Sequence, residues 1–126
     1  LSRGPDPRDG RIPSASGSGV IDVLVIGSGH VTHNLRDWMH HRHDPQPLDY
    51  VSRFADWLHE RLVAGDREAL LAYRDRAPDA VRAHPTEEHF LPLLVALGAA
   101  GIAARPRRAY AAIDAAALSM DAYIFD

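Results

Sequence analysis

Hydrophobic and polar positions along the chain predict one buried strand followed by several helices. Residues 20–26 are aliphatic except for Asp22 and are bounded by glycines, which predicts a buried strand of the parallel type. Apolar residues at helical spacing predict an amphipathic helix over residues 47–63 that Gly65 ends. Asp66 then caps a second, shorter predicted helix. This order of elements predicts an α/β fold with a mixed or parallel sheet flanked by helices.

The most apolar stretch of the chain directly follows a polar cluster. Residues 83–101 join two histidines and two glutamates to an unbroken apolar run. Thr86 is a favourable helix N-cap, and the glutamates fall in a first turn where negative charge suits the helix dipole. Pro92 removes a backbone donor, which predicts a bend there, or a short first turn and a restart of the helix at Leu91 or Pro92. The remainder is apolar nearly all round and predicts a buried helix that ends at Gly98 or Gly101.

Shorter patterns complete the predicted order of elements. Residues 30–39 predict a helix capped by Thr32, and residues 102–110 predict a loop with arginine and proline. Residues 122–125 predict a final strand. Residues 1–19 are rich in Gly, Pro, Ser and Arg and predict a disordered leader or a truncation scar.

The composition fits one compact domain and argues against several classes of function. With 126 residues, of which 46% are hydrophobic, the chain is long enough to bury a core. It has no cysteine, so a bound metal must be held by histidine and carboxylate. A net charge of -3 gives no footprint for a nucleic-acid partner. No apolar run approaches the roughly 20 residues that cross a bilayer, so we predict no membrane partner and a cytoplasmic location.

The glycine-rich turn after the predicted strand raises two alternatives. Gly27 and Gly29 before a helix suggest a phosphate-binding loop, but Thr32 occupies the third glycine position and there is no Walker lysine. Ser28 would be the nucleophile of a G-x-S-x-G elbow, but its glycines are adjacent to it rather than two residues away. Nucleotide binding and serine hydrolysis are therefore the weaker interpretations.

Histidines supply the strongest candidate chemistry. His33 follows the carboxyl end of the predicted strand, where open α/β sheets place their sites, and a histidine there can transfer protons near neutral pH. The alternative is a histidine at a helix start that bonds only backbone. Asn34 is a candidate orienter or polar substrate contact, or simply a helix cap. His30 is a candidate for lining the same site, or a residue of the turn surface.

A second pair of histidines lies in the polar cluster. His84 and His89 are not at the i, i+4 spacing that places two ligands on one helix face, so they converge only if Pro85 bends the chain. A metal site needs about three protein ligands, so this pair alone is a weak signal. Glu87 and Glu88 are further candidate ligands, or solvated partners of the helix dipole.

Taken together, the two site-like segments resemble a known family. The stretches VLVIGSGHVTHNLRDW (23–38), AHPTEEHFLPLLVALGAAG (83–101) and LSMDAYIF (118–125) resemble the C-terminal half of class III extradiol ring-cleavage dioxygenases, nearest to the DOPA 4,5-dioxygenase type. The resemblance implies that residues 20–126 are the C-terminal part of the catalytic domain. It also implies a non-haem enzyme that uses Fe(II), or Zn(II), and O2 to open the ring of a catechol-type substrate.

The resemblance implies a role for each candidate residue. The histidine of the G-S-G-x-x-x-H-N-L motif is His33, which would be the catalytic acid/base. The second histidine of the H-P-T-x-x-H motif is His89, which would be a metal ligand. The first, His84, would line the pocket and assist binding or proton transfer, while Asn34 and His30 would contact the substrate.

The same resemblance implies that the site is completed elsewhere. In this family the other two metal ligands are histidines of an N-terminal half, and residues 1–126 resemble only the C-terminal half. We therefore expect an incomplete enzyme whose partner is a missing N-terminal half, or a homo-oligomer. The alternative is a non-catalytic remnant or partner subunit that associates through an uncovered sheet edge.

Overall fold

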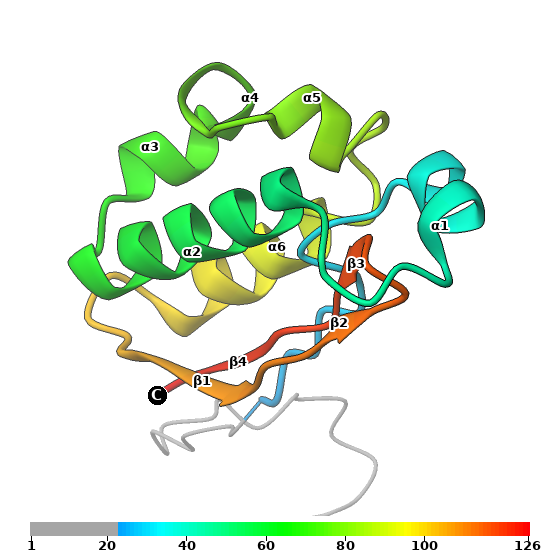
Figure 1. Ribbon diagram of the computed structural model, residues 1–126. Helices are drawn as coiled ribbons and strands as arrows, with labels where there is room; N and C mark the ends of the chain where they lie inside the picture. The colour runs from blue at the N-terminus through cyan, green and yellow to red at the C-terminus, as the bar shows by residue number, and fades with distance from the viewer. Residues whose placement is uncertain (1–22) are drawn as a thin grey trace, which may run out of the picture.

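The computed structural model describes residues 23–126, so the leader predicted over residues 1–19 lies outside the described residues. Figure 1 shows α2 at the centre, with α3, α4 and α5 on one side of it and α6 and the strands on the other. The helices are α1 (Leu35–His41), α2 (Asp49–Ala64), α3 (Arg67–Leu71), α4 (Tyr73–Arg76), α5 (Ala80–Ala83) and α6 (Leu91–Ala100). The strands are β1 (Pro106–Tyr110), β2 (Ile113–Asp114), β3 (Leu118–Ser119) and β4 (Ala122–Phe125).

Helix α2 is the centre of the hydrophobic core and confirms the predicted amphipathic helix. Its apolar residues recur at helical spacing, so one face is buried and the other carries the charges. It ends at Gly65, whose φ of 67° is the left-handed conformation that favours glycine. The buried residues of this face are Tyr50, Val51, Phe54, Ala55, Leu58 and Leu62.

The second predicted helix is present but broken in two. Asp66 caps it as predicted, because its carboxylate accepts a hydrogen bond from the backbone N–H of Ala69 at 3.0 Å. The helical path ends at Ala72, whose φ of -96° and ψ of 26° separate α3 from α4. The break lets the chain turn over α2, so that Tyr73 is buried against the core.

Helix α6 confirms the predicted restart at the proline but not the predicted burial. It begins at Leu91, with Pro92 in the first turn, and its C-cap is Gly101. Of its residues only Leu97 is buried, and Val95 is 62% exposed. The reason is that the described chain covers only one side of this apolar helix. No helix among the described residues is long and apolar enough to cross a membrane.

The described residues form helices and two small sheets, which confirms the α/β class. Both of these sheets are antiparallel, so the described part of the chain does not contain a parallel sheet. Strand β4 forms where predicted and pairs with β1, with Arg107 opposite Ile124. Strand β2 pairs with β3. The loop predicted over residues 102–110 was wrong, because pairing with β4 draws Pro106–Tyr110 into a strand despite its arginines and proline.

The predicted strand over residues 20–26 is not formed where it is described. Its first three residues lie outside the described chain, and residues 23–26 are extended but outside any sheet. Their side chains are between 42% and 84% exposed. A strand of this composition is stable only when it is paired and covered, and no described segment provides the partner.

Candidate active site

A short segment without regular secondary structure carries two of the predicted site residues. We call residues 30–33 the histidine segment. At its start, the backbone N–H of His30 donates to the carbonyl oxygen of His89 at 2.8 Å. At its end, the N–H of His33 donates to the carbonyl oxygen of Ala83 at 2.8 Å. These two bonds tie the histidine segment to the chain between α5 and α6, which contains the second motif.

The middle of the histidine segment is tied to β3 through Thr32. The Thr32 hydroxyl donates to the carbonyl oxygen of Ala117 at 2.9 Å and accepts from the N–H of Ser119 at 2.7 Å. The N–H of Val31 donates to the carbonyl oxygen of Ser119 at 3.1 Å. Thr32 is fully buried, and its hydroxyl is engaged by these backbone groups. The prediction that it caps a helix was therefore wrong, because α1 begins after Asn34, which is its cap.

Asn34 is held entirely by backbone groups. Its side-chain oxygen accepts from the N–H of Asp37 at 3.0 Å, which is a helix cap, and its amide donates to the carbonyl oxygen of Arg82 at 2.8 Å. The capping alternative for Asn34 is therefore what the structure shows. Both polar atoms of the amide are engaged, so its first role is to connect α1 to α5.

The glycines of the turn before the histidine segment permit a close approach of two chain segments. A Cβ atom on Gly27 would lie 2.2 Å from the carbonyl oxygen of Pro92, and one on Gly29 would lie 2.1 Å from that of His89. Any side chain at either position would push these segments apart. The turn is thus glycine-rich because it lies against the start of α6, and this contact brings the two histidine motifs together.

Three histidine rings meet where the two motifs touch. The rings of His33 and His89 stack with centroids 3.5 Å apart and planes 10° from parallel. The ring of His30 lies 5.1 Å from that of His33 and 6.2 Å from that of His89. The structure therefore brings together three residues that the sequence proposed for one site, although no spacing along the chain places the two motifs side by side.

The environment of this cluster favours the neutral form of two of its rings, His30 and His33. Burial lowers the pKa of His33, and the neighbouring His89 and His30 rings lower it further. Burial and the nearby His89 also lower the pKa of His30. Glu88 lies close, with a carboxylate oxygen 3.6 Å from Nδ1 of His89. At neutral pH the His30 and His33 rings are therefore neutral and can accept protons.

His84, which the sequence predicted to line the pocket of the active site, lies in the hydrophobic core. Its side chain is fully buried among aromatic rings, and its Nε2 lies 2.6 Å from the carbonyl oxygen of Val31. Burial lowers its pKa to about 4, so the ring is neutral at pH 7. The rings around it belong to Phe54, Tyr73 and Phe90.

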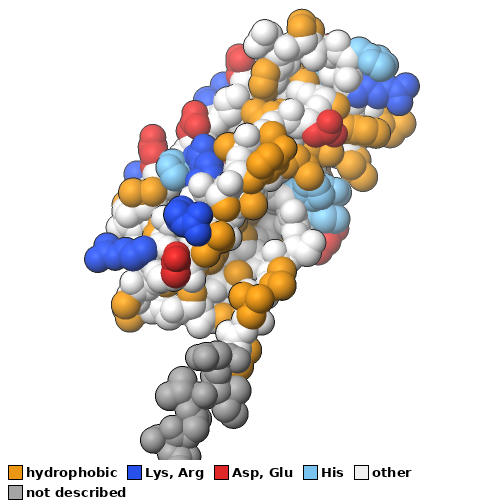
Figure 2. Space-filling view, turned by 90° about the horizontal axis from the view of Figure 1, so that it is seen from below, with side chains coloured by type: hydrophobic (Ala, Val, Ile, Leu, Met, Phe, Trp, Pro, Cys, Tyr) orange, Lys and Arg blue, Asp and Glu red, His pale blue; other side chains and the backbone are white. Residues whose placement is uncertain are grey.

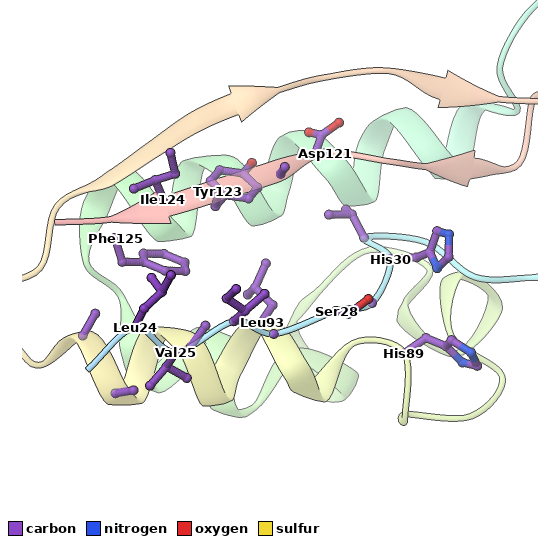
Figure 3. Close-up of a pocket in the computed structure, with 18 of the residues that line it drawn as sticks. Leu24, Val25, Ser28, His30, His89, Leu93, Asp121, Tyr123, Ile124 and Phe125 are labelled. Carbon is purple, nitrogen blue, oxygen red and sulfur yellow. The ribbon is translucent and has the colours of Figure 1, made fainter. Parts of the chain in front are cut away.

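The His30 and His89 rings lie at the polar end of an apolar pocket of about 660 Å³. Figure 3 shows residues 24–28 along one wall and β4 along the other, with Leu93 of α6 between them. Seen from below, hydrophobic side chains surround the hollow and histidines gather at one side (Figure 2). We call this cavity the apolar pocket. The cavity is thus divided into an apolar body and a polar end, which suits a ligand that is divided in the same way.

Sequence reasoning assigned no role to two pocket residues from the last motif. Asp121 has a side chain only 5% exposed, 3.5 Å from the guanidinium of Arg108, and it accepts from the Ser119 hydroxyl at 3.2 Å. Tyr123 lies beside it on β4 and accepts from Arg108 at 3.2 Å. The SMDAY residues of the third resembling stretch were the only signal for them.

The described residues do not complete a metal site. His89 offers a buried Nδ1 without a hydrogen-bond partner among them, as expected of a candidate ligand. However, no three metal-binding side chains of the described part are grouped around one point. Stacked imidazoles also direct their nitrogen lone pairs along parallel planes, so His33 and His89 do not converge on one ion.

Comparison with known proteins defines the class. Residues 21–117 match the family described as the catalytic LigB subunit of aromatic ring-opening dioxygenase, and the chain belongs to that family. It is 36% identical over 104 residues to the 4,5-DOPA dioxygenase extradiol of Portulaca grandiflora, and 35% identical over 103 residues to that of Beta vulgaris. Each match covers 82% of this chain but only 38% of the relative. A protein of the same name from Escherichia coli strain K12 is 32% identical over 80 residues, 61% of this chain and 29% of that protein.

Proposed function

We propose that this chain forms part of an extradiol dioxygenase that opens the ring of a catechol-type aromatic with O2. The observation that carries the proposal is the cluster of His30, His33 and His89 beside the polar end of the apolar pocket. Family membership and relatives named 4,5-DOPA dioxygenase extradiol support it. The pocket would hold the ring of the substrate, and the histidines would face its hydroxyl groups.

His33 is the proposed acid/base. A neutral imidazole accepts a proton, and the lowered pKa of His33 keeps it in that form at neutral pH. It would take the proton of a substrate hydroxyl and return it later in the reaction, so that no net proton is consumed by the residue. The proposed part of His30 is to contact the substrate from the same wall, and Asn34 fixes the start of α1 beside them.

Metal binding is proposed only for a completed site. His89 is the proposed ligand, supported by its buried Nδ1, which makes no hydrogen bond among the described residues and has a Glu88 carboxylate oxygen 3.6 Å away. The candidate metals are Fe(II) and Zn(II). Since the described residues do not supply three converging ligands, the remaining ligands would come from other polypeptide. The relatives are long enough to carry it, because the matched stretch is 38% of their length.

Association with another polypeptide is a second proposed function, which a specific observation favours. The apolar side chains of residues 23–26, on one wall of the apolar pocket, are exposed. On the other wall, β4 pairs only with β1 among the described strands, so its second edge is unpaired there. Exposed apolar side chains and an unpaired strand edge both favour association with another polypeptide. The proposed occupant is the remaining part of the family fold. A second copy of this chain is the alternative that a measurement of oligomeric state would reveal.

The proposed activity is tested by substitution in the enzyme completed with the rest of the family fold. With Fe(II) and a catechol such as DOPA, oxygen uptake should accompany a yellow ring-opened product. His33→Ala should lower kcat by about 10²–10⁴-fold, the usual size of an acid/base contribution, and His89→Ala should also lose bound metal. His43→Ala, on the exposed loop after α1, is the control. Full activity in His33→Ala would overturn the proposal.

The predicted cytoplasmic location stays a prediction, which cell fractionation would test.

A further inference from the structure

The side chain of His84 bonds the backbone of the histidine segment. Its Nε2 lies 2.6 Å from the carbonyl oxygen of Val31, between His30 and Thr32. A carbonyl oxygen only accepts, so Nε2 carries the proton and donates it. Nδ1 of His84 has no hydrogen-bond partner among the described residues, so this bond is the one polar contact the ring makes there.

The backbone of His84 is held by two hydrogen bonds, and its ring is enclosed by aromatic side chains. Its backbone N–H donates to the carbonyl oxygen of Ala80 at 2.9 Å, and its own carbonyl accepts from the guanidinium of Arg74 at 3.0 Å. The ring is 0% exposed. It is enclosed by the rings of Phe54, Tyr73 and Phe90, with centroids 5.6, 6.3 and 5.0 Å away. A donor fixed in this way sets the place of whatever accepts from it.

Two consecutive residues therefore clamp the histidine segment. The carbonyl oxygen of Ala83 accepts from the N–H of His33, while the ring of His84 donates to the carbonyl oxygen of Val31. Between them these bonds fix both sides of Thr32. The ring of His33, which stacks on His89 at 3.5 Å, is attached to the chain at one end of this clamp.

We propose that His84 is a positioning residue, which holds the backbone of the histidine segment through Val31 and thereby sets the stacking of His33 on His89. The two histidines of the H-P-T-x-x-H motif then have different tasks: the first fixes geometry from inside the core, and the second lies in the site. Its relevance to ring opening rests on the proposed function, but the structural claim does not.

The test compares variants by NMR on the 126-residue chain. His84→Gln places an amide N–H near the position of Nε2 and can still donate to Val31, whereas the shorter His84→Asn and the apolar His84→Leu cannot. Nuclear Overhauser effects between the His33 and His89 rings should persist in His84→Gln and be lost in the other two. Leu70→Ala, a core variant in α3, should lower the melting temperature yet keep those signals.

Three results would overturn the inference. Ring ¹⁵N shifts of the unsubstituted chain that place the His84 proton on Nδ1 would remove the donor, whether or not any variant folds. Ring contacts between His33 and His89 that survive in folded His84→Leu would show that the clamp is not needed. Loss of the same contacts in Leu70→Ala would show that they follow general stability. None of these readouts uses enzyme activity, so a failure of the proposed function would be seen separately.

Discussion

The rings of His33 and His89 lie face to face, 3.5 Å apart and within 10° of parallel, although they come from motifs far apart in the chain. Two imidazolium cations would repel at this distance, so the arrangement requires at least one neutral ring. The lowered pKa of His33 agrees with that requirement. The stacking thus connects a packing feature, the contact of the glycine turn with the start of α6, to His33, the proposed acid/base beside the polar end of the apolar pocket.

The buried His84 predicts a loss of stability in mild acid. Its pKa is about 4 in the folded chain against an ordinary 6.5, so the unfolded chain binds the proton first as the pH falls. The contribution should be complete above about pH 6.5 and decline between pH 6.5 and 4, by roughly 3 kcal/mol at most. Urea unfolding from pH 7.5 to 4.5 should show a shallower decline in His84→Gln. An unchanged decline would contradict this assignment, and His43→Gln, at an exposed site, is the control.

The close approach at Gly29 predicts that a glycine-to-alanine substitution in the turn and one in α6 have opposite effects on stability. Gly29→Ala places a methyl group 2.1 Å from the carbonyl oxygen of His89, which should cost about 1–3 kcal/mol of unfolding free energy and separate the two motifs. Gly98→Ala has nothing within 4 Å and lies inside α6, so it should stabilise by up to about 1 kcal/mol. Urea unfolding curves measure both. Equal effects of the two changes would show that the close approach is absent.

Thr32 predicts a cost for removing a buried hydroxyl. Thr32→Val keeps the shape but leaves the carbonyl oxygen of Ala117 and the N–H of Ser119 unpaired, so it should lower the unfolding free energy by about 1–3 kcal/mol. Thr32→Ser retains both bonds and should lose less. Thr86→Val, at an exposed hydroxyl, should stay within about 0.5 kcal/mol. A Thr32→Val variant as stable as the original would contradict the proposed anchoring of the histidine segment to β3.

Local patterns predicted those elements whose cause is local. The sequence predicted the helical spacing of α2 with the glycine that ends it, the Asp66 cap and the start of α6 next to Pro92. Each of these features depends on neighbouring residues. Strand β1 was missed because its sequence is unremarkable and its structure comes from pairing with β4. The strand predicted over residues 20–26 is not formed at residues 23–26, its described part, for the converse reason: its composition suits a sheet, but the described chain offers it no partner.

The sequence proposed residues for the candidate site but not their arrangement. Resemblance to a family identified His33 and His89, and the structure brings their rings together. The burial of His84 was not predictable from its motif, because it depends on aromatic rings contributed by three other segments. The third glycine position of the turn is Thr32, whose hydroxyl is used by β3, which a spacing rule for nucleotide loops does not reveal.

The exposed apolar segment predicts an interface that a single charge should disrupt. Ile26 is 79% exposed and lines the apolar pocket, whereas Ile102 is 90% exposed but does not line it. A lysine in a buried apolar contact must be desolvated, so Ile26→Lys should weaken association with the remaining part of the family fold by at least about tenfold, or about 1.4 kcal/mol. Ile102→Lys should leave it unchanged. Isothermal titration calorimetry measures the affinity, and sedimentation velocity of the chain alone reports whether a second copy takes the same place. Equal affinities of the two variants would place the interface elsewhere on the molecule.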